Sequence, residues 1–220
     1  MRFRGHSRPT TVVAWGFVAM AMTVGLTGCI GWSVSKAGPT GSTEGAAGNS
    51  SLSDAGAEHI QRTGSANFDW SSGRLLLQDI GLTGPSDFAN AVSAKDHAHP
   101  IAVTIHAPKA TIRVPSDRIF PYVAAGSDEI GELWLTVRAE DDEQFVRFVR
   151  DYASVAGIEG DGLNAWVTGY AADPRSTCGA LGYNTPVGTA TGLDVWLEMS
   201  CTWDLEPRRF VSVHVAPPEL

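Results

Sequence analysis

The chain has 220 residues, of which 24 are acidic and 16 are Lys or Arg, so its formal net charge is −8. Three of the basic residues precede Cys29, which leaves 13 basic and 24 acidic residues, a net charge of −11, from that cysteine onward. This balance argues against a nucleic-acid partner and against charge-driven binding to an anionic membrane, because both attract basic proteins.

The first 28 residues have the pattern of an export signal. Arg2, Arg4 and Arg8 give a basic start, and residues 11–28 contain no charged side chain. A basic start followed by an apolar run and small residues is typical of a secretory signal peptide. The alternative is a transmembrane helix, because about 18 apolar residues are the shortest run that crosses a bilayer.

The end of the apolar run favours the signal peptide. Leu26-Thr27-Gly28-Cys29 resembles the lipobox of bacterial lipoproteins, in which an aliphatic residue and two small residues precede a cysteine. In that family the cysteine sulfur receives a diacylglycerol, and the chain is cut just before it. The resemblance implies a mature chain that begins at Cys29, held by its lipid on the extracytoplasmic side of the cell membrane. It says nothing about the folded domain.

Residues 29–66 are expected to form a flexible tether between the lipid and the domain. Residues 33–65 are mostly Gly, Ser, Thr and Ala, a composition that buries too little apolar surface to offset the entropy of ordering. A tether of about 35 residues spans roughly 30–35 Å. The remaining residues, 67–220, have a length that fits one domain with its own core.

Alternation of apolar and polar residues predicts several strands in this domain. The longest such segment is 193–205, in which every odd position is apolar. Four shorter segments alternate in the same way: 101–105, 110–114, 133–137 and 210–215. Segments 75–80 and 165–170 are weaker strand candidates. One polar face per strand favours antiparallel pairing.

The clearest helix is predicted to begin at Asp141 or Asp142 and to end at Val155. Acidic residues crowd its first turn, where they favour the positive end of the helix dipole, and Gly157 supplies a stop. Apolar residues recur at spacings of three and four, at Phe145, Phe148, Val149, Tyr152 and Ala156. A second, shorter helix is expected over residues 85–93. The predicted fold class is α+β, a single domain with an antiparallel sheet and one or two helices on one face.

Two cysteines, Cys178 and Cys201, follow Cys29. In an exported protein, this pair predicts a disulfide, because the compartment is oxidising and the count without Cys29 is even. The bridge would close a separation of 23 residues and contribute roughly 3 kcal/mol to stability. The alternative is a free thiol nucleophile, which needs a histidine partner that the sequence does not place near either cysteine.

His97 and His99 are candidate metal ligands. On an extended strand, residues two apart project to one face, so both imidazoles could bind one divalent metal together with a carboxylate. His106 and His214 are further candidates for this role. The alternative is an exposed polar loop before a strand, for which Pro100 is a suitable first residue.

Trp134 and Trp196 lie in the phase opposite to the aliphatic residues of their strands. One interpretation is that both faces of the sheet are covered and the two rings pack under a helix or loop. The other is an exposed aromatic patch that binds a glycan, a peptide or a partner protein.

The sequence contains none of the common motifs of hydrolases, metalloproteases, nucleotide-binding or dinucleotide-binding proteins. We therefore expect a lipid-anchored envelope protein that binds a partner protein, glycan or small ligand without catalysis. A metal-binding or metal-delivery lipoprotein that uses His97 and His99 is the alternative, and a divalent metal is the one cofactor considered. An envelope hydrolase is the third hypothesis; its sign would be histidine and carboxylate side chains that converge in one pocket.

Overall fold

The computed structural model describes residues 48–83, 91–179, 182–203 and 207–219. All of them belong to the second of two compact units, residues 32–220. The predicted signal peptide, the lipobox and Cys29 lie outside the described residues. Among the described helices, none is long and apolar enough to cross a membrane.

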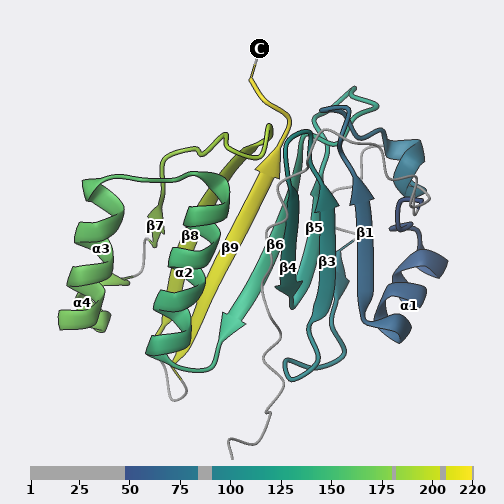
Figure 1. Ribbon diagram of the computed structural model, residues 1–220. Coiled ribbons are helices and arrows are strands. Elements are labelled where there is room, and N and C mark those ends of the chain that lie inside the picture. Colours follow the sequence, from purple (N-terminus) through teal and green to yellow (C-terminus); the bar gives the residue numbers. More distant parts are fainter. Residues whose placement is uncertain (1–47, 84–90, 180–181, 204–206, 220) are drawn as a thin grey trace, which may run out of the picture. The chain divides into compact units, whose positions relative to one another are not determined.

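The described strands form two sheets (Figure 1). In the first sheet, β3 (Ile101–His106) lies between β1 (Ser65–Asp69), to which it is parallel, and β4 (Thr111–Ser116), to which it is antiparallel. The second sheet is antiparallel throughout, in the order β2 (Val92–Ser93), β5 (Arg118–Tyr122), β6 (Glu132–Ala139), β9 (Arg208–Ala216), β8 (Asp194–Thr202) and β7 (Tyr183–Asn184). With the helices below, this arrangement confirms an α+β domain, although the sheet is divided in two.

The parallel pairing of β1 and β3 differs from the antiparallel sheet that the sequence predicts. Parallel neighbours need a crossover connection of a dozen or more residues, and residues 70–100 supply it. Alternation favours antiparallel pairing but does not require it, and both β1 and β3 keep an alternating burial pattern in their parallel pair.

Helix α2 (Asp142–Ala156) confirms the predicted helix and covers one face of the second sheet, against β6, β8 and β9 (Figure 1). The carboxylate of Asp141 accepts a 2.7 Å hydrogen bond from the backbone N–H of Gln144, which caps the first turn. The helix ends at Gly157, whose φ of 72° is the left-handed conformation that glycine adopts most easily.

Two weaker strand predictions are wrong. Residues 75–80 form a bridge and a short helix, η1 (Leu77–Ile80), and residues 165–170 lie in α3 (Asp161–Ala172). The buried residues of α3 recur at helical spacing: Leu163, Trp166, Val167 and Tyr170. Short apolar runs of this kind fit a helix and a strand equally well. A four-residue helix, α4 (Pro174–Thr177), follows α3.

The folded domain begins earlier than residue 67. Helix α1 (Asp54–Thr63) and the first residues of β1 fall within the segment predicted to be a tether. The side chain of Ser53 caps α1, and Leu52 and Ile60 are each 1% exposed. A short helix is held here by tertiary packing and a cap, which average composition does not reveal. The second predicted helix, residues 85–93, lies largely outside the described residues; its described end forms β2.

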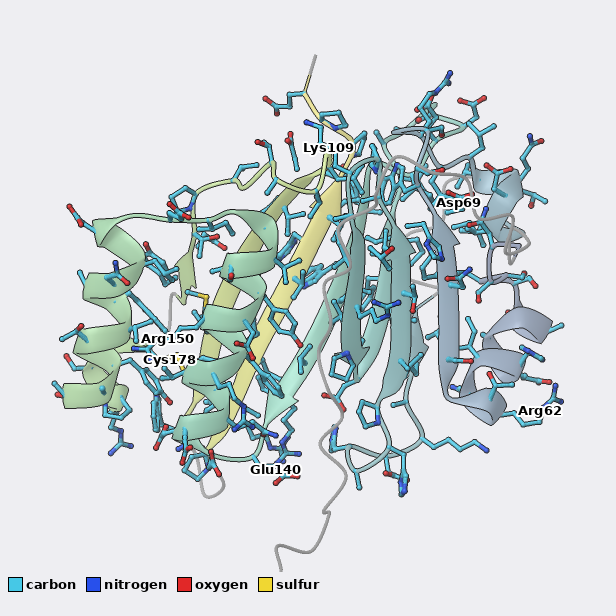
Figure 2. All side chains as sticks on the ribbon, viewed as in Figure 1. Arg62, Asp69, Lys109, Glu140, Arg150 and Cys178 are labelled. Atoms are coloured by element: carbon cyan, nitrogen blue, oxygen red, sulfur yellow. A yellow bond between two sulfur atoms is a disulfide. The ribbon has the colours of Figure 1, made fainter. Side chains whose placement is uncertain are left out.

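Cys178 and Cys201 form a disulfide, with a Cα–Cα distance of 5.7 Å (Figure 2). The bridge joins the end of α4 to the far part of β8, and Cys178 is completely buried. The indole N–H of Trp203 donates a 2.8 Å hydrogen bond to the carbonyl of Cys178 and closes this corner of the domain. The predicted pairing is therefore confirmed.

Candidate functional site

A row of four rings crosses the second sheet on the face opposite α2. Phe120 on β5 pairs with Trp134 on β6, Trp134 pairs with His214 on β9, and His214 pairs with Trp196 on β8. Directly opposite residues project to the same face, so these four side chains form one line, which we call the aromatic row. Successive ring centroids are 5.7, 5.0 and 4.9 Å apart, the separations of stacked rings.

The face that carries the aromatic row is the more open face of the sheet. Leu133, Leu135 and Leu197, which face the other way, are completely buried. Trp134 and Trp196, which alternate with them, are partly exposed, whereas Phe120 and His214 in the same row are buried. The two tryptophans are therefore neither fully covered nor fully exposed, so each of the two interpretations describes them only in part.

His214 lies between the two tryptophans and is only 7% exposed. Its ring is stacked on Trp196 with an interplanar angle of 14° and on Trp134 with an angle of 26°. Its Nδ1–H donates a hydrogen bond to Glu132, and Oε2 of Glu198 lies 3.5 Å from its Nε2. The imidazole therefore joins the two indoles into one rigid surface with a carboxylate at each ring nitrogen.

Two buried nitrogens of the aromatic row lack a hydrogen-bond partner among the described residues: Nε1 of Trp134 and Nε2 of His214. A buried polar atom without a partner costs free energy, of the order of 1–3 kcal/mol. Unsatisfied groups of this kind need an explanation, such as an ordered water, an ion or a catalytic role. At the other end of the row, the guanidinium of Arg118 lies 4.1 Å over the centroid of Phe120.

A cavity of about 630 Å³ lies beside the last ring of the row. Trp196 forms part of its wall, together with Asp194 from the start of β8 and Glu219 from the C-terminal segment. This volume is within the range of small-molecule sites, roughly 300–1,000 Å³. The aromatic row and the cavity together are the candidate functional site.

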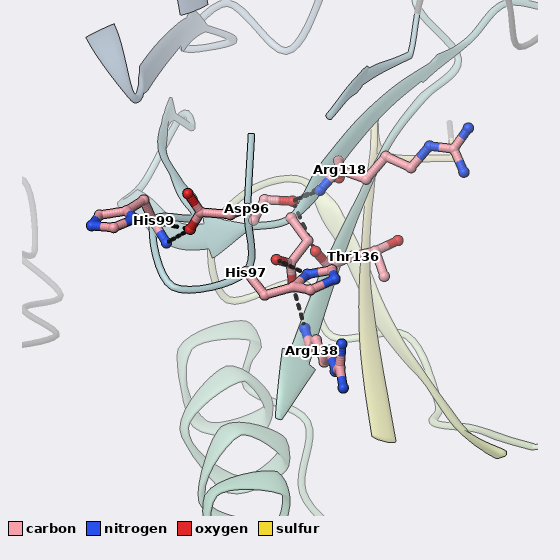
Figure 3. Close-up of polar contacts among 8 residues, drawn as sticks. Asp96, His97, His99, Arg118, Thr136 and Arg138 are labelled. Carbon is pink, nitrogen blue, oxygen red and sulfur yellow. Dashed lines mark hydrogen bonds and ion pairs between the residues drawn. The ribbon is translucent and has the colours of Figure 1, made fainter. Parts of the chain in front are cut away.

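His97 and His99 do not face each other (Figure 3). Nδ1 of His97 lies 2.9 Å from Oδ1 of Asp117, whereas Nδ1 of His99 lies 2.8 Å from Oδ1 of Asp96. Both imidazoles are largely exposed, and the segment that carries them is a loop before β3. In the described ranges, no group of three or more His, Cys, Asp or Glu side chains could hold a metal ion. The arrangement matches the polar loop that the sequence offers as the alternative.

Asp117 has a structural role at the point where the chain passes from the first sheet to the second. Its carboxylate also accepts a 2.7 Å hydrogen bond from the backbone N–H of Arg138 on β6, and its own N–H donates to the carbonyl of Thr136. His97 therefore contacts a carboxylate that already joins β6 to the β4–β5 connection.

A second polar cluster links α2, α3 and β9. Nε of Arg209 lies 2.5 Å from Oδ1 of Asp142, and the hydroxyl of Tyr170 donates to the same carboxylate. The hydrogen bond from Arg209, followed by that from Tyr170, lowers the pKa of Asp142, whereas burial raises the pKa of Tyr170. The three groups satisfy one another, which indicates a structural role rather than a reactive one.

The structure places Trp134 and Trp196 in one row with His214 and Phe120. The sequence suggests His214 only as a metal ligand and does not point to Phe120. His214 is predicted to lie on the polar face of the segment 210–215, as Trp134 and Trp196 do on their strands. This agreement becomes useful only when the order of the strands is known.

Comparisons of the chain with protein-family models, with curated proteins and with solved structures found no match. Similarity to other proteins therefore assigns neither a family nor an activity. The function is inferred from the residues of the aromatic row and the cavity.

Proposed function

We propose that the chain is a lipid-anchored protein of the cell envelope whose domain binds a partner protein, a glycan or a small ligand through the aromatic row. The observation that carries this proposal is the stack of Trp134, His214 and Trp196 on the more open face of the second sheet. Rigid aromatic side chains give a large contact area at a low cost in conformational entropy, and they are enriched where proteins bind other molecules.

Two features support the extracytoplasmic location. Cys29 follows a lipobox-like sequence at the end of an uncharged run of 18 residues, 11–28. The disulfide between Cys178 and Cys201 is of a kind that persists in oxidising compartments and is rare in the cytosol.

Binding without catalysis accounts for the surroundings of His214 better than nucleophilic catalysis does. The histidine does converge with two carboxylates, Glu132 and Glu198, as a hydrolase would require. Nucleophilic catalysis also needs a hydroxyl or thiol within hydrogen-bond reach of the base. In the part of the chain that the structure describes, no Ser, Thr or Cys side chain makes that hydrogen bond to His214.

The binding proposal predicts that ligands stabilise the protein only while the row is intact. We expect a thermal-shift screen of the full chain in detergent, against wall fragments and small metabolites, to find compounds that raise the melting temperature. At one hundred times Kd the gain is about 2.7 kcal/mol, which corresponds to roughly 5–10 °C for a domain of this size. Trp134→Ala and Trp196→Ala should each abolish the shift.

The matched control is Trp203→Ala, which removes a partly exposed indole from the disulfide corner instead of the aromatic row. This variant should respond to the same compounds as the wild type. If the compounds stabilise Trp134→Ala and Trp196→Ala as much as they stabilise the wild type, their site lies elsewhere and the aromatic row is not the binding surface.

The anchor predicts a second outcome. In cells, Cys29→Ala should take up no lipid and should keep residues 1–28, because cleavage and attachment both depend on this cysteine in lipoproteins. Metabolic labelling with a palmitate analogue, followed by gel electrophoresis, measures both effects. A Cys29→Ala protein that is labelled and shortened like the wild type would mean that Cys29 is not the lipidated residue.

A further inference from the structure

We propose that the cavity beside Trp196 binds a small organic cation that carries a flat ring, such as an arylalkylamine or an aryl quaternary ammonium. This inference rests on the proposed binding function and names the class of ligand for the same site. Two features of the cavity carry it: an aromatic ring that continues the row and carboxylates that are not balanced by basic groups in its wall.

The walls of the cavity are tied to β8, the strand that carries Trp196. The segment after β7 is held to β8 by a pair of backbone hydrogen bonds between Gly188 and Val195, 2.7 and 2.9 Å long. Gly188 fits only as glycine, because a Cβ there would lie 2.3 Å from the carbonyl oxygen of Ala156. On the opposite side, the backbone N–H of Glu219 donates a 3.0 Å hydrogen bond to Asp194. Both walls are therefore fixed by bonds to the same strand.

Trp196 is the last ring of the aromatic row. Its ring is stacked on the imidazole of His214 at 4.9 Å, and it also lines the cavity. A flat ring of the ligand could therefore occupy the next position of the stack.

The charge of the wall selects a cation. Asp194 and Glu219 both line the cavity, and the lining residues within the described ranges include no Lys or Arg. The indole face of Trp196 attracts positive charge through its quadrupole, and tryptophan is the strongest of the aromatic residues in this respect. A carboxylate ligand would be repelled by the same two side chains.

The test is a titration of the full chain in detergent with phenyltrimethylammonium. Binding is measured by calorimetry and by the quenching of tryptophan fluorescence. We expect saturable binding that weakens as salt is raised, because the carboxylates are near the surface. Benzoate, which has the same ring and a negative charge, should not bind. Asp194→Asn and Glu219→Gln should each weaken binding of the cation roughly three- to tenfold.

Matched variants separate this inference from the binding function itself. Trp196→Ala should abolish binding of the cation, Trp196→Phe should keep most of it, and Glu58→Gln on α1 should leave it unchanged. The proposal that the ligand is a cation is overturned if phenyltrimethylammonium does not bind. It is also overturned if Asp194→Asn and Glu219→Gln bind this cation as tightly as the wild type does. If N-acetylglucosamine oligomers bind instead and Trp196→Ala abolishes that binding, the cation is wrong but the aromatic row remains a binding surface.

Discussion

Replacement of both Cys178 and Cys201 by alanine is expected to lower the free energy of unfolding by about 3 kcal/mol. The bridge closes a loop of 23 residues, so its loss returns conformational freedom to the unfolded chain. It also releases the end of α4 from β8 in the folded state, at a corner where Cys178 is completely buried. For a domain of this size, the melting temperature should fall by roughly 6–12 °C.

Urea denaturation of the wild type, of the wild type under reducing conditions and of the double variant measures this effect. The reduced wild type and the double variant should unfold at similar urea concentrations, because both lack the covalent link. Equal stability of the oxidised wild type and the double variant would mean that the bridge contributes nothing. That result would leave hydrogen bonding by Trp203 as the contact that holds the corner.

The second large effect is expected for His214→Ala, which should cost about 3 kcal/mol. The variant loses two ring stacks, each worth about 0.5–1.5 kcal/mol, and leaves Glu132 without its hydrogen-bond donor. It also opens a gap between Trp134 and Trp196, so the aromatic row should lose its ligands as well as its stability.

A conservative series divides this cost into its parts. His214→Phe keeps a flat ring between the indoles and loses the contacts with Glu132 and Glu198, so about 1–2 kcal/mol should be lost. Glu198→Gln should change stability little, because its carboxylate is 3.5 Å from Nε2 and partly exposed. Thermal unfolding at neutral pH measures all three variants. If His214→Ala is as stable as the wild type, the stack is not a structural unit.

The sequence predicted the strands of the domain better than their arrangement. Strict alternation over 193–205 and 210–215 identifies β8 and β9, because one face of each is closed by α2. Helix α2 was equally clear from its cap and its apolar stripe. Helix α1 is not predicted because Ile60 is its one fully buried side chain, within a segment whose average composition is that of a linker.

The candidate site could be predicted only in part. The phase of Trp134 and Trp196 placed each ring on the outward face of its own strand. That His214 stands between them depends on β9 pairing both with β8, the strand before it in the chain, and with β6, where Trp134 lies 80 residues before His214. Register and strand order are set by long-range packing, so local patterns do not contain them.

The two outer strands of the second sheet, β2 and β7, are each only two residues long. An edge strand offers unpaired N–H and C=O groups to which a strand of another molecule can bond, the first step of edge-to-edge aggregation. Here β2 pairs with β5 and β7 pairs with β8, so the outermost strand at each margin of this sheet is a short template. A protein concentrated on a membrane surface by the proposed lipid anchor would need this protection against its own copies.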